Sequence, residues 1–535
     1  MLTPNPRRLR VAGLGAALVA LTLTSAGATA AASGGAGTPS TATVALRGGA
    51  IHGISTSWGF AFRGIPYAAP PIGQLRWRPP QPPADWQGVR DATRFGPSCP
   101  QTASPFFPPG RLAEDCLYLN VSTPTLRRGA HRPVLVWIHG GGFTQDSARN
   151  YIGSKLARRG LVVVTVNYRL GALGFLAHPA LATHHDTAGN YGLMDQQAAL
   201  RWVRQNIARF GGDADNVTIA GQSAGGVSVL AQLVSRGARG LFQRAIVQSG
   251  TFALHQQSLA SAETAGEAFA AKAGCPSQTA RCLRHLPVAK LVSNFPGSAI
   301  PGVVDGKVLT ESIGTALRQG RFAQVPVLNG IVHNEEWLFV AGLGVAVSNG
   351  TFVLVPPVSA ENYADVIAAT VGVSPARAQA IAAKYPPAAY GAPIVALSTL
   401  LSDANFACPA LQVDRWTSRR VPTFGYQFND DNAPQRFTKP DVLPPIATHG
   451  SEIQYLFSQP NLPFPGAPFT TDQRVLSRHM RAAWASFAAA GSPATGALGW
   501  PSIAGGARVM SLVPPRPELE SGYSADHHCA FWAAG

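Results

Sequence analysis

The chain has 535 residues, of which 46% are hydrophobic and 13% charged, and its formal net charge is +16. This composition is typical of a globular protein with a sizeable core, and it excludes a disordered or fibrous chain. The basic residues are mostly arginines that stand singly or in pairs, without the Lys/Arg-rich block that a nucleic-acid binder would usually carry, so we expect no nucleic-acid partner.

The first 32 residues have the three parts of a secretory signal. Arginines precede the apolar run 11–23, and small residues come after it. A membrane anchor would need about 20 apolar residues, so stable membrane insertion is not expected. The residues after Arg7-Arg8 fit a twin-arginine signal poorly, although the route of export stays open. We therefore expect residues 1–32 to be a signal peptide, residues 33–42 to be a flexible leader, and the mature protein to be secreted.

Short apolar strands alternate with longer helical patterns along the rest of the chain. The predicted strands cover 134–140, 161–169, 217–221, 244–250, 325–332 and 423–428, and the clearest helix covers 191–211. Such an alternation is typical of an α/β fold with a mainly parallel sheet covered on both faces. Residues 43–90 predict antiparallel edge strands with long loops, and residues 340–420 predict helices that form a cap. Because no linker is visible, we expect one domain over residues 43–535.

Six cysteines lie after the predicted signal, and an even number in an exported protein indicates disulfides. Fifteen pairings are possible, and short separations favour two local loops. The favoured pairs are Cys99–Cys116 and Cys275–Cys282, which leaves Cys408–Cys529. The spacings do not resemble a zinc site, so we expect no metal and no thiol nucleophile.

The most informative motif is GQSAG at 221–225, which has the form G-x-S-x-G. An apolar strand pattern precedes it and a helical pattern comes after it, which is the context in which this motif presents a nucleophilic serine on a sharp turn. We therefore predict that Ser223 is a nucleophile. The alternative is an ordinary turn serine.

A second motif, HGGG, stands directly after the predicted strand 134–138. Glycine N–H groups in such a segment can stabilise the oxyanion of a tetrahedral intermediate, because no side chains obstruct them. We expect Gly141, Gly142 and Ala224 to supply these donors. A glycine loop that only permits close packing is the alternative. His139 is expected to be structural, since the general base should come after the serine in this chain order.

Residues 210–225 resemble the nucleophile signature of the type-B carboxylesterase/lipase family, the relatives of the cholinesterases. Residues 114–124 resemble the second signature of that family. Further similar stretches keep the family order over nearly the whole mature chain, at 62–80, 167–176, 190–207, 303–309 and 482–501. The resemblance implies a bacterial, secreted α/β-hydrolase with catalytic residues in the order Ser, acid, His.

The resemblance also assigns the remaining site residues. In the family segment that 325–339 resembles, an acidic residue stands five positions after a glycine, which gives Glu335. Glu336 is the competitor, at a position where the family usually has Gly. Residues 447–457 resemble the histidine loop and give His449 as the base. By the same comparison, Ser249 is a serine near the triad, and an ion pair joins Arg76 and Glu114.

The implied activity is hydrolysis of small-molecule carboxylic esters through an acyl-enzyme, with no cofactor. A lipase acting on triglycerides and a non-catalytic binding protein on the same fold are the alternatives, and amides or carbamates could use the same groups. Gln222 replaces the cholinesterase Glu, and the loop between Cys99 and Cys116 has no Trp, which argues against choline esters. The stretch 295–302 has few bulky aromatics, which predicts a roomier acyl site. Natural substrate and oligomeric state are not predicted.

Overall fold

The computed structural model describes residues 41–104, 106–183, 188–295, 302–348, 350–437, 446–496, 498–503 and 508–534, which belong to one compact unit. The predicted signal peptide lies outside these ranges, as do residues 33–40 of the predicted leader. Thr41 and Ala42, the last two residues of that leader, belong to the first strand and pair with Ile54 and Gly53. The first strand therefore begins two residues before the predicted start of the domain.

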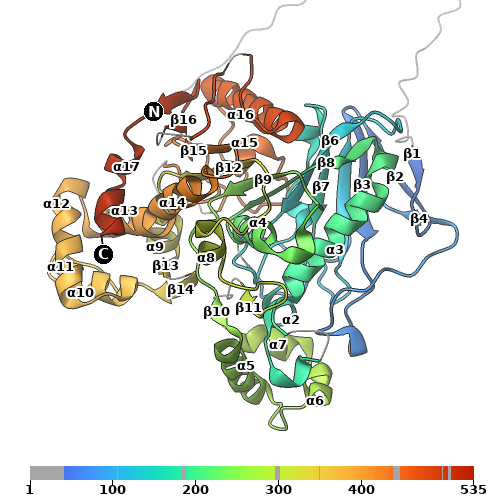
Figure 1. The fold of residues 1–535 in the computed structure, drawn as a ribbon, viewed down its shortest axis with the longest axis horizontal. Coiled ribbons are helices and arrows are strands. Elements are labelled where there is room, and N and C mark those ends of the chain that lie inside the picture. The colour runs from blue at the N-terminus through green and yellow to red at the C-terminus, as the bar shows by residue number, and fades with distance from the viewer. Residues whose placement is uncertain are drawn as a thin grey trace, which may run out of the picture. The chain divides into compact units, whose positions relative to one another are not determined.

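A 13-stranded sheet runs through the described part of the chain (Figure 1). Its spatial order is β1 (Thr41–Ala45), β2 (Ala50–Thr56), β3 (Gly59–Pro66), β5 (Tyr118–Thr123), β7 (Val162–Val166), β6 (Arg132–Ile138), β8 (Gly212–Gln222), β9 (Arg244–Gln248), β12 (Val327–Val332), β15 (Thr423–Phe428), β16 (Val509–Leu512) and β17 (Glu518–Glu520), with β4 (Val89–Asp91) beside β2. All pairings from β7 to β16 are parallel. The predicted, mainly parallel sheet is thus confirmed.

The antiparallel part of the sheet is its N-terminal edge. Strands β1, β2, β3, β5 and β7 pair antiparallel in that order, which confirms the prediction for residues 43–90. Only β4 departs from it, since it pairs parallel with β2. At the opposite edge β17 is antiparallel to β16.

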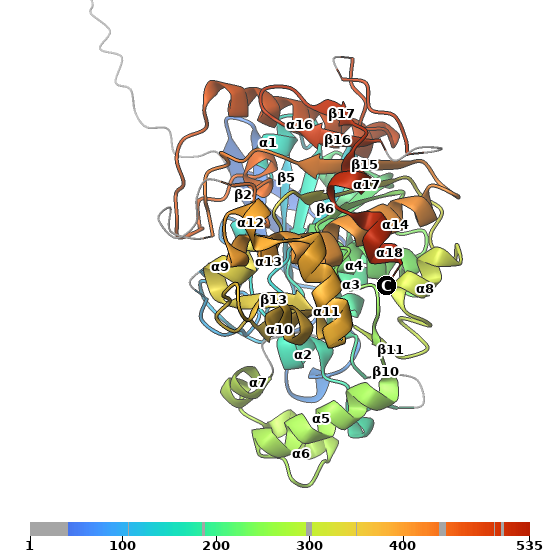
Figure 2. The same cartoon turned by 90° about the vertical axis from the view of Figure 1, so that its left-hand side faces the viewer.

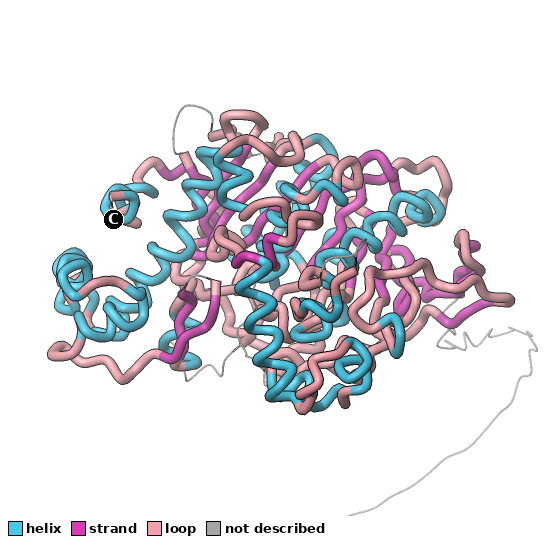
Figure 3. Tube along the Cα trace, turned by 60° about the horizontal axis from the view of Figure 1, so that its bottom comes forward, coloured by secondary structure: helices cyan, strands magenta, loops and turns pink. Residues whose placement is uncertain are grey.

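Helices cover both faces of the sheet (Figure 3). On β6, Val136 and Ile138 point into one core, while Leu135 and Trp137 point into the other, because successive side chains of a strand face opposite sides. The first face carries α3 (Tyr191–Asn206), α4 (Ala224–Val234), α8 (Ile313–Arg318) and α14 (Cys408–Thr417), and the second carries α1 (Ser154–Ala157), α15 (Ile453–Leu456) and α16 (Thr471–Ala490). Both faces are buried, which explains why these strands are apolar at nearly every position.

The predicted helix 191–211 ends earlier than expected. Helix α3 stops at Asn206, and a 3-10 turn, Ile207–Phe210, continues to Gly211. Gly211 has φ of 75°, a left-handed conformation that glycine adopts readily and that ends helices. The chain can then turn directly into β8, the strand that leads to Ser223.

Most of the predicted region 340–420 forms a separate group of helices with a small hairpin, next to the sheet, while its last helix, α14, packs on the sheet itself (Figure 2). The elements are α9 (Trp337–Leu343), β13 (Val345–Ser348), β14 (Thr351–Leu354), α10 (Tyr363–Ile367), α11 (Pro375–Lys384), α12 (Pro387–Tyr390) and α13 (Pro393–Ser402). The helices predicted from the patterns in this region are confirmed. The helical stretch Pro393–Thr417 is long and apolar enough to cross a membrane, but 67% of its most apolar window is buried inside the protein, as in a core helix.

A second group of short elements comes after β9, at the bottom of Figure 1. It contains β10 (Gln257–Ser258), α5 (Leu259–Ala273), α6 (Ala280–His285), α7 (Val288–Asn294) and β11 (Val303–Val304). The remaining helices are α2 (Gly171–Phe175), α17 (Tyr523–Asp526) and α18 (Cys529–Ala533). Helix α5 packs near α7 and β10 rather than on the sheet.

The six cysteines, all within the described ranges, form three disulfides. They join Cys99 to Cys116, Cys275 to Cys282 and Cys408 to Cys529, which confirms the favoured pairing. The third bond links the start of α14 to α18, across 121 residues. Three disulfides are consistent with an oxidising, extracellular environment.

Candidate active site

Ser223 lies at the turn between β8 and α4, where the sequence predicts a sharp bend. Its backbone has φ of 58° and ψ of −126°, a conformation that non-glycine residues rarely adopt. The flanking glycines are required by close packing: a Cβ at Gly225 would lie 2.0 Å from the carbonyl oxygen of Ile138, and one at Gly221 would lie 2.4 Å from that of Gly225. The motif therefore forms a strained strand-to-helix turn, the backbone geometry that the prediction of a nucleophilic Ser223 requires.

The imidazole of His449 and the carboxylate of Glu335 form a buried pair. Nδ1 of His449 lies 2.5 Å from Oε2 of Glu335. Glu335 stands just after the end of β12 and is fully buried, and its other oxygen accepts a hydrogen bond from the Val332 N–H at 2.8 Å. His449 and Ser223 line the same cavity. The fold thus brings together three residues that are 112 and 114 positions apart along the chain (335 − 223 and 449 − 335).

Gln222 contacts the other nitrogen of the His449 ring. Its Nε2 lies 3.0 Å from Nε2 of His449. Because Nδ1 of His449 faces the Glu335 carboxylate and carries the proton, the Nε2 atom is the acceptor, and the Gln222 amide donates to it. The sequence indicates only that Gln222 removes a negative charge beside the nucleophile. The contact with His449 was not predicted, since it depends on the side-chain conformation.

The backbone N–H groups of Gly141, Gly142 and Ala224 are free to receive an anion. None of the three donates a hydrogen bond to another part of the described chain. Each of these N–H groups shares a peptide unit with the carbonyl of the preceding residue, and that carbonyl is hydrogen-bonded. The Gly140 carbonyl contacts Nδ1 of His139, the Gly141 carbonyl accepts from two backbone N–H groups, and the Ser223 carbonyl accepts from an N–H of helix α4. In a trans peptide the N–H points opposite to the C=O. Gly141 and Gly142 also line the cavity beside Ser223, which is the arrangement that an oxyanion hole requires.

The cavity in front of Ser223 has a volume of about 570 Å³, which suits a small organic ligand. Its apolar wall consists of Phe106, Phe107, Leu338, Phe339, Leu343, Val345, Phe352 and Phe437. Sequence reasoning missed these residues, although the pair Phe106-Phe107 inside the first disulfide loop was a visible signal. The roomier acyl site predicted from 295–302 lies almost entirely outside the described residues.

Three residues assigned by resemblance, Ser249, Arg76 and Glu114, do not line the cavity. Ser249 is buried at the end of β9, where its N–H donates to the Gly330 carbonyl at 2.8 Å. Its hydroxyl has no hydrogen-bond partner within the described chain. The ion pair of Arg76 and Glu114 is confirmed, with two contacts of 2.8 and 2.6 Å, and Arg76 also donates to the Leu286 carbonyl. This pair stabilises the loop that ends in the first disulfide.

The competitor Glu336 points away from the histidine. Its carboxylate accepts hydrogen bonds from the Val347 N–H and the Asn405 amide, both at 3.2 Å. Glu336 is fully buried, and this burial raises its pKa to about 8. Glu336 therefore holds the β13–β14 hairpin, which carries part of the cavity wall, while Glu335 holds the imidazole.

The raised pKa of Glu336 makes the stability of the protein depend on pH. A carboxylate that titrates near pH 4.5 when unfolded and near pH 8 when folded binds more protons in the folded state between these values. The free energy of unfolding should therefore fall as the pH rises through this range. The uncharged side chain of Glu336→Gln does not titrate. We therefore expect the free energy of unfolding of this variant, minus that of the wild type, to increase as the pH is raised from 5.5 to 8.5, measured by urea unfolding. A pH-independent difference between the two proteins would contradict this expectation.

A mainly parallel sheet with a strained serine at a strand-to-helix turn, beside a buried His–Glu pair, defines an α/β-hydrolase. Comparison with known sequences narrows this class. The chain belongs to the carboxylesterase family, which matches residues 40–532. It is accordingly a carboxylic ester hydrolase.

Several hydrolases and esterases are similar to this chain and support its assignment to the family. An acylcarnitine hydrolase of Mus musculus is 35% identical over 491 residues, which cover 86% of this chain and 85% of the relative. A cocaine esterase of Homo sapiens is 34% identical over 501 residues, with coverages of 86% and 85%. Among solved structures, a PNB esterase is 30% identical, with a TM-score of 0.76, and the match covers 91% of this chain and 99% of that one.

Proposed function

We propose that this carboxylesterase works through an acyl-enzyme on Ser223, with His449 as general base and Glu335 as the residue that orients it. The observation that carries the proposal is the 2.5 Å contact of Glu335 with His449, whose side chain lines the same cavity as Ser223. A serine hydroxyl is a weak nucleophile and needs such a base. The adjacent carboxylate fixes the proton on Nδ1, so Nε2 is the accepting nitrogen. In the structure Nε2 accepts from the Gln222 amide at 3.0 Å, and this bond must give way to the Ser223 hydroxyl before the proton can be transferred.

The geometry supports the following sequence of steps. His449 takes the proton from Ser223 as its oxygen attacks the ester carbonyl, and the N–H groups of Gly141, Gly142 and Ala224 stabilise the oxyanion. When the tetrahedral intermediate collapses, His449 gives the proton to the leaving alcohol, and the acyl group stays on Ser223. A water molecule repeats these steps in the second half of the cycle and releases the carboxylic acid.

The cavity favours small, uncharged, hydrophobic esters. Of the described residues that line it, none is acidic, so a cationic alcohol group would find no counter-charge there. Aromatic and aliphatic side chains from the first disulfide loop, α9 and the β13–β14 hairpin would enclose the substrate. We also propose that the protein is secreted, which its three disulfides support.

A covalent-trapping experiment tests the mechanism. We expect a p-nitrophenyl ester to release one equivalent of p-nitrophenol per enzyme molecule in a rapid burst, provided that deacylation is the slower step. A fluorophosphonate should add once to the protein, and peptide mass spectrometry should locate it on Ser223. Labelling of a different serine, with hydrolysis abolished, would overturn the assignment of the nucleophile.

A further inference from the structure

Asp146 stands in a strained position four residues beyond the second oxyanion glycine. Its φ is 80°, in the left-handed region that a non-glycine residue adopts only when its surroundings hold it there. Its side chain is fully buried. Strained residues of this kind cluster at functional sites, so the contacts of this carboxylate are informative.

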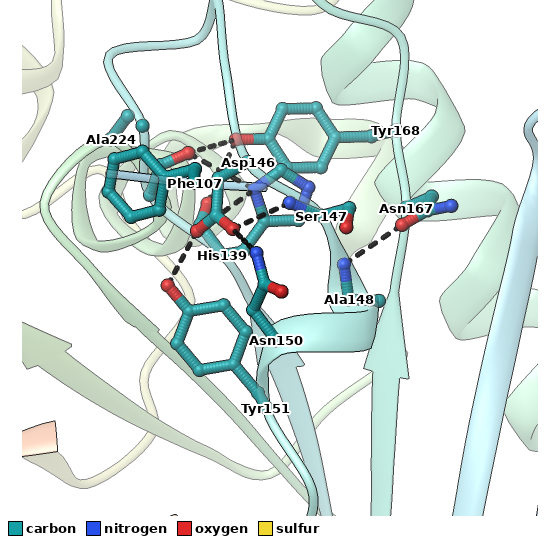
Figure 4. A network of polar contacts seen from close by, with 12 residues as sticks. Phe107, His139, Asp146, Ser147, Ala148, Asn150, Tyr151, Asn167, Tyr168 and Ala224 are labelled. Carbon is teal, nitrogen blue, oxygen red and sulfur yellow. Dashed lines mark hydrogen bonds and ion pairs between the residues drawn. The ribbon is translucent and has the colours of Figure 1, made fainter. Parts of the chain in front are cut away.

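The carboxylate of Asp146 makes hydrogen bonds through both oxygens (Figure 4). Oδ1 accepts from the Ser147 N–H at 2.7 Å and from the Asn150 amide at 2.8 Å. Oδ2 accepts from the Tyr151 hydroxyl at 2.6 Å and lies 3.9 Å from Nδ1 of His139. The carboxylate is therefore fixed between the loop that comes after it and the histidine that precedes the oxyanion glycines.

The backbone of Asp146 is fixed as well. The amide of Gln101 accepts from its N–H at 2.8 Å and donates to its carbonyl at 3.0 Å. The Cβ of Asp146 also abuts the oxyanion segment, because a Cβ built on Gly141 would lie only 2.9 Å from it. A displacement of Asp146 would thus reach Gly141 directly.

His139 connects the carboxylate to the oxyanion donors. Burial lowers the pKa of His139, so the ring is neutral near pH 7 and carries one proton. Its Nδ1 faces two acceptors, the carbonyl oxygen of Gly140 at 3.1 Å and Oδ2 of Asp146. The proton must therefore lie on Nδ1, since a lone pair there would face two negative atoms.

That proton fixes one of the peptide groups that the reaction uses. The Nδ1–H of His139 holds the Gly140 carbonyl, and the N–H of the same peptide group, on Gly141, points the opposite way. Tyr168 packs against the same segment: its ring stacks on His139 at 4.5 Å, and its hydroxyl donates to the His139 carbonyl at 2.9 Å. The same hydroxyl is farther from the Gly140 carbonyl, at 3.5 Å, so the Nδ1–H of His139 is the nearer donor to that group. The orientation of the Gly141 N–H thus depends on which nitrogen of His139 is protonated.

We propose that Asp146 is a positioning residue of the esterase reaction, whose carboxylate selects the Nδ1–H tautomer of His139 and thereby aims the Gly141 N–H at the oxyanion. This inference rests on the oxyanion hole of the proposed function. It assigns a role in transition-state stabilisation to a side chain that touches neither substrate nor reacting atoms.

The isosteric variant Asp146→Asn is the primary test. It keeps the size of the side chain and one acceptor oxygen, but it removes the charge that favours Nδ1–H. We expect kcat on p-nitrophenyl acetate to fall about 10- to 100-fold with little change in KM, less than the 100- to 1000-fold loss of a whole oxyanion donor. Affinity for a trifluoromethyl ketone, which forms a tetrahedral oxyanion on the serine, should fall in proportion to kcat.

Asp414→Asn is the matched control, because Asp414 is also buried and hydrogen-bonded to an asparagine, Asn329, but does not line the cavity. It should leave kcat and ketone affinity unchanged. A folded Asp146→Asn enzyme with wild-type kcat and ketone affinity would overturn the inference. A wild-type enzyme that the ketone does not inhibit would instead contradict the proposed function.

Variants of His139 test the same connection if Asp146→Asn does not fold. His139→Asn places an amide N–H near the position of Nδ1 whatever the charge of Asp146, whereas His139→Leu places no donor there. We expect the Asn variant to keep most of the ketone affinity and the Leu variant to lose it. Equal affinities in the two folded variants would contradict the proposed role of the Nδ1–H group.

Discussion

Ser223→Ala should lower kcat on p-nitrophenyl esters about a million-fold, the size of loss that removal of the nucleophile causes in a serine hydrolase. Without the hydroxyl no acyl-enzyme can form, so the histidine and the oxyanion donors can act only on a water molecule. The residual rate should remain above that of the uncatalysed reaction, because binding and the oxyanion hole are retained. Steady-state kinetics over a range of enzyme concentrations measure the loss in kcat and the residual rate above the uncatalysed reaction.

Ser249→Ala is the matched control for this experiment. Ser249 also has positive φ and stands near the same edge of the sheet, but it is buried and does not line the cavity. We expect its replacement to change kcat less than about tenfold, because its hydroxyl makes no hydrogen bond within the described chain. Comparable activities in the Ser223→Ala enzyme and the wild type would remove the central assignment.

The sequence predicts the parts of this molecule that depend on local pattern. The strand 423–428 is predicted with its exact bounds, because a short apolar run between turns has few other interpretations in an α/β protein. The turn at Ser223 is predicted from two glycines that tolerate no Cβ in the folded protein. The three disulfides are predicted from separation along the chain, since the two local loops leave a single remaining pair.

The features that the sequence does not predict depend on side chains that meet across the fold. The amide of Gln222 faces His449 from 227 positions away, and no local pattern reveals that contact. The cavity wall joins Phe106 of a disulfide loop to Phe352 of a hairpin and Phe437 of a later loop. Asp146 is missed for a different reason: its backbone has positive φ, but the sequence has an aspartate there and not the glycine that would have indicated this conformation.

The choice between Glu335 and Glu336 shows the limit of sequence reasoning most sharply, since the two carboxylates are adjacent. Glu335→Gln should lower kcat about ten-thousand-fold, because an amide facing Nδ1 of His449 favours the tautomer whose Nε2 carries the proton and cannot accept another. Glu336→Gln should lower kcat less than about tenfold, because that carboxylate contacts Val347 and Asn405 instead.

The same p-nitrophenyl ester assay measures both variants, and the ratio of the two effects decides between the two carboxylates. If Glu335→Gln lowers kcat at least a thousandfold more than Glu336→Gln does, then the charge of Glu335 acts on the imidazole, and Glu336 only supports the hairpin that forms part of the cavity wall. KM should stay nearly constant in Glu335→Gln, because the substrate cavity does not include this buried side chain. If Glu336→Gln proved the more damaging change, the catalytic acid would have to be reassigned, and the 2.5 Å contact of Glu335 would be structural.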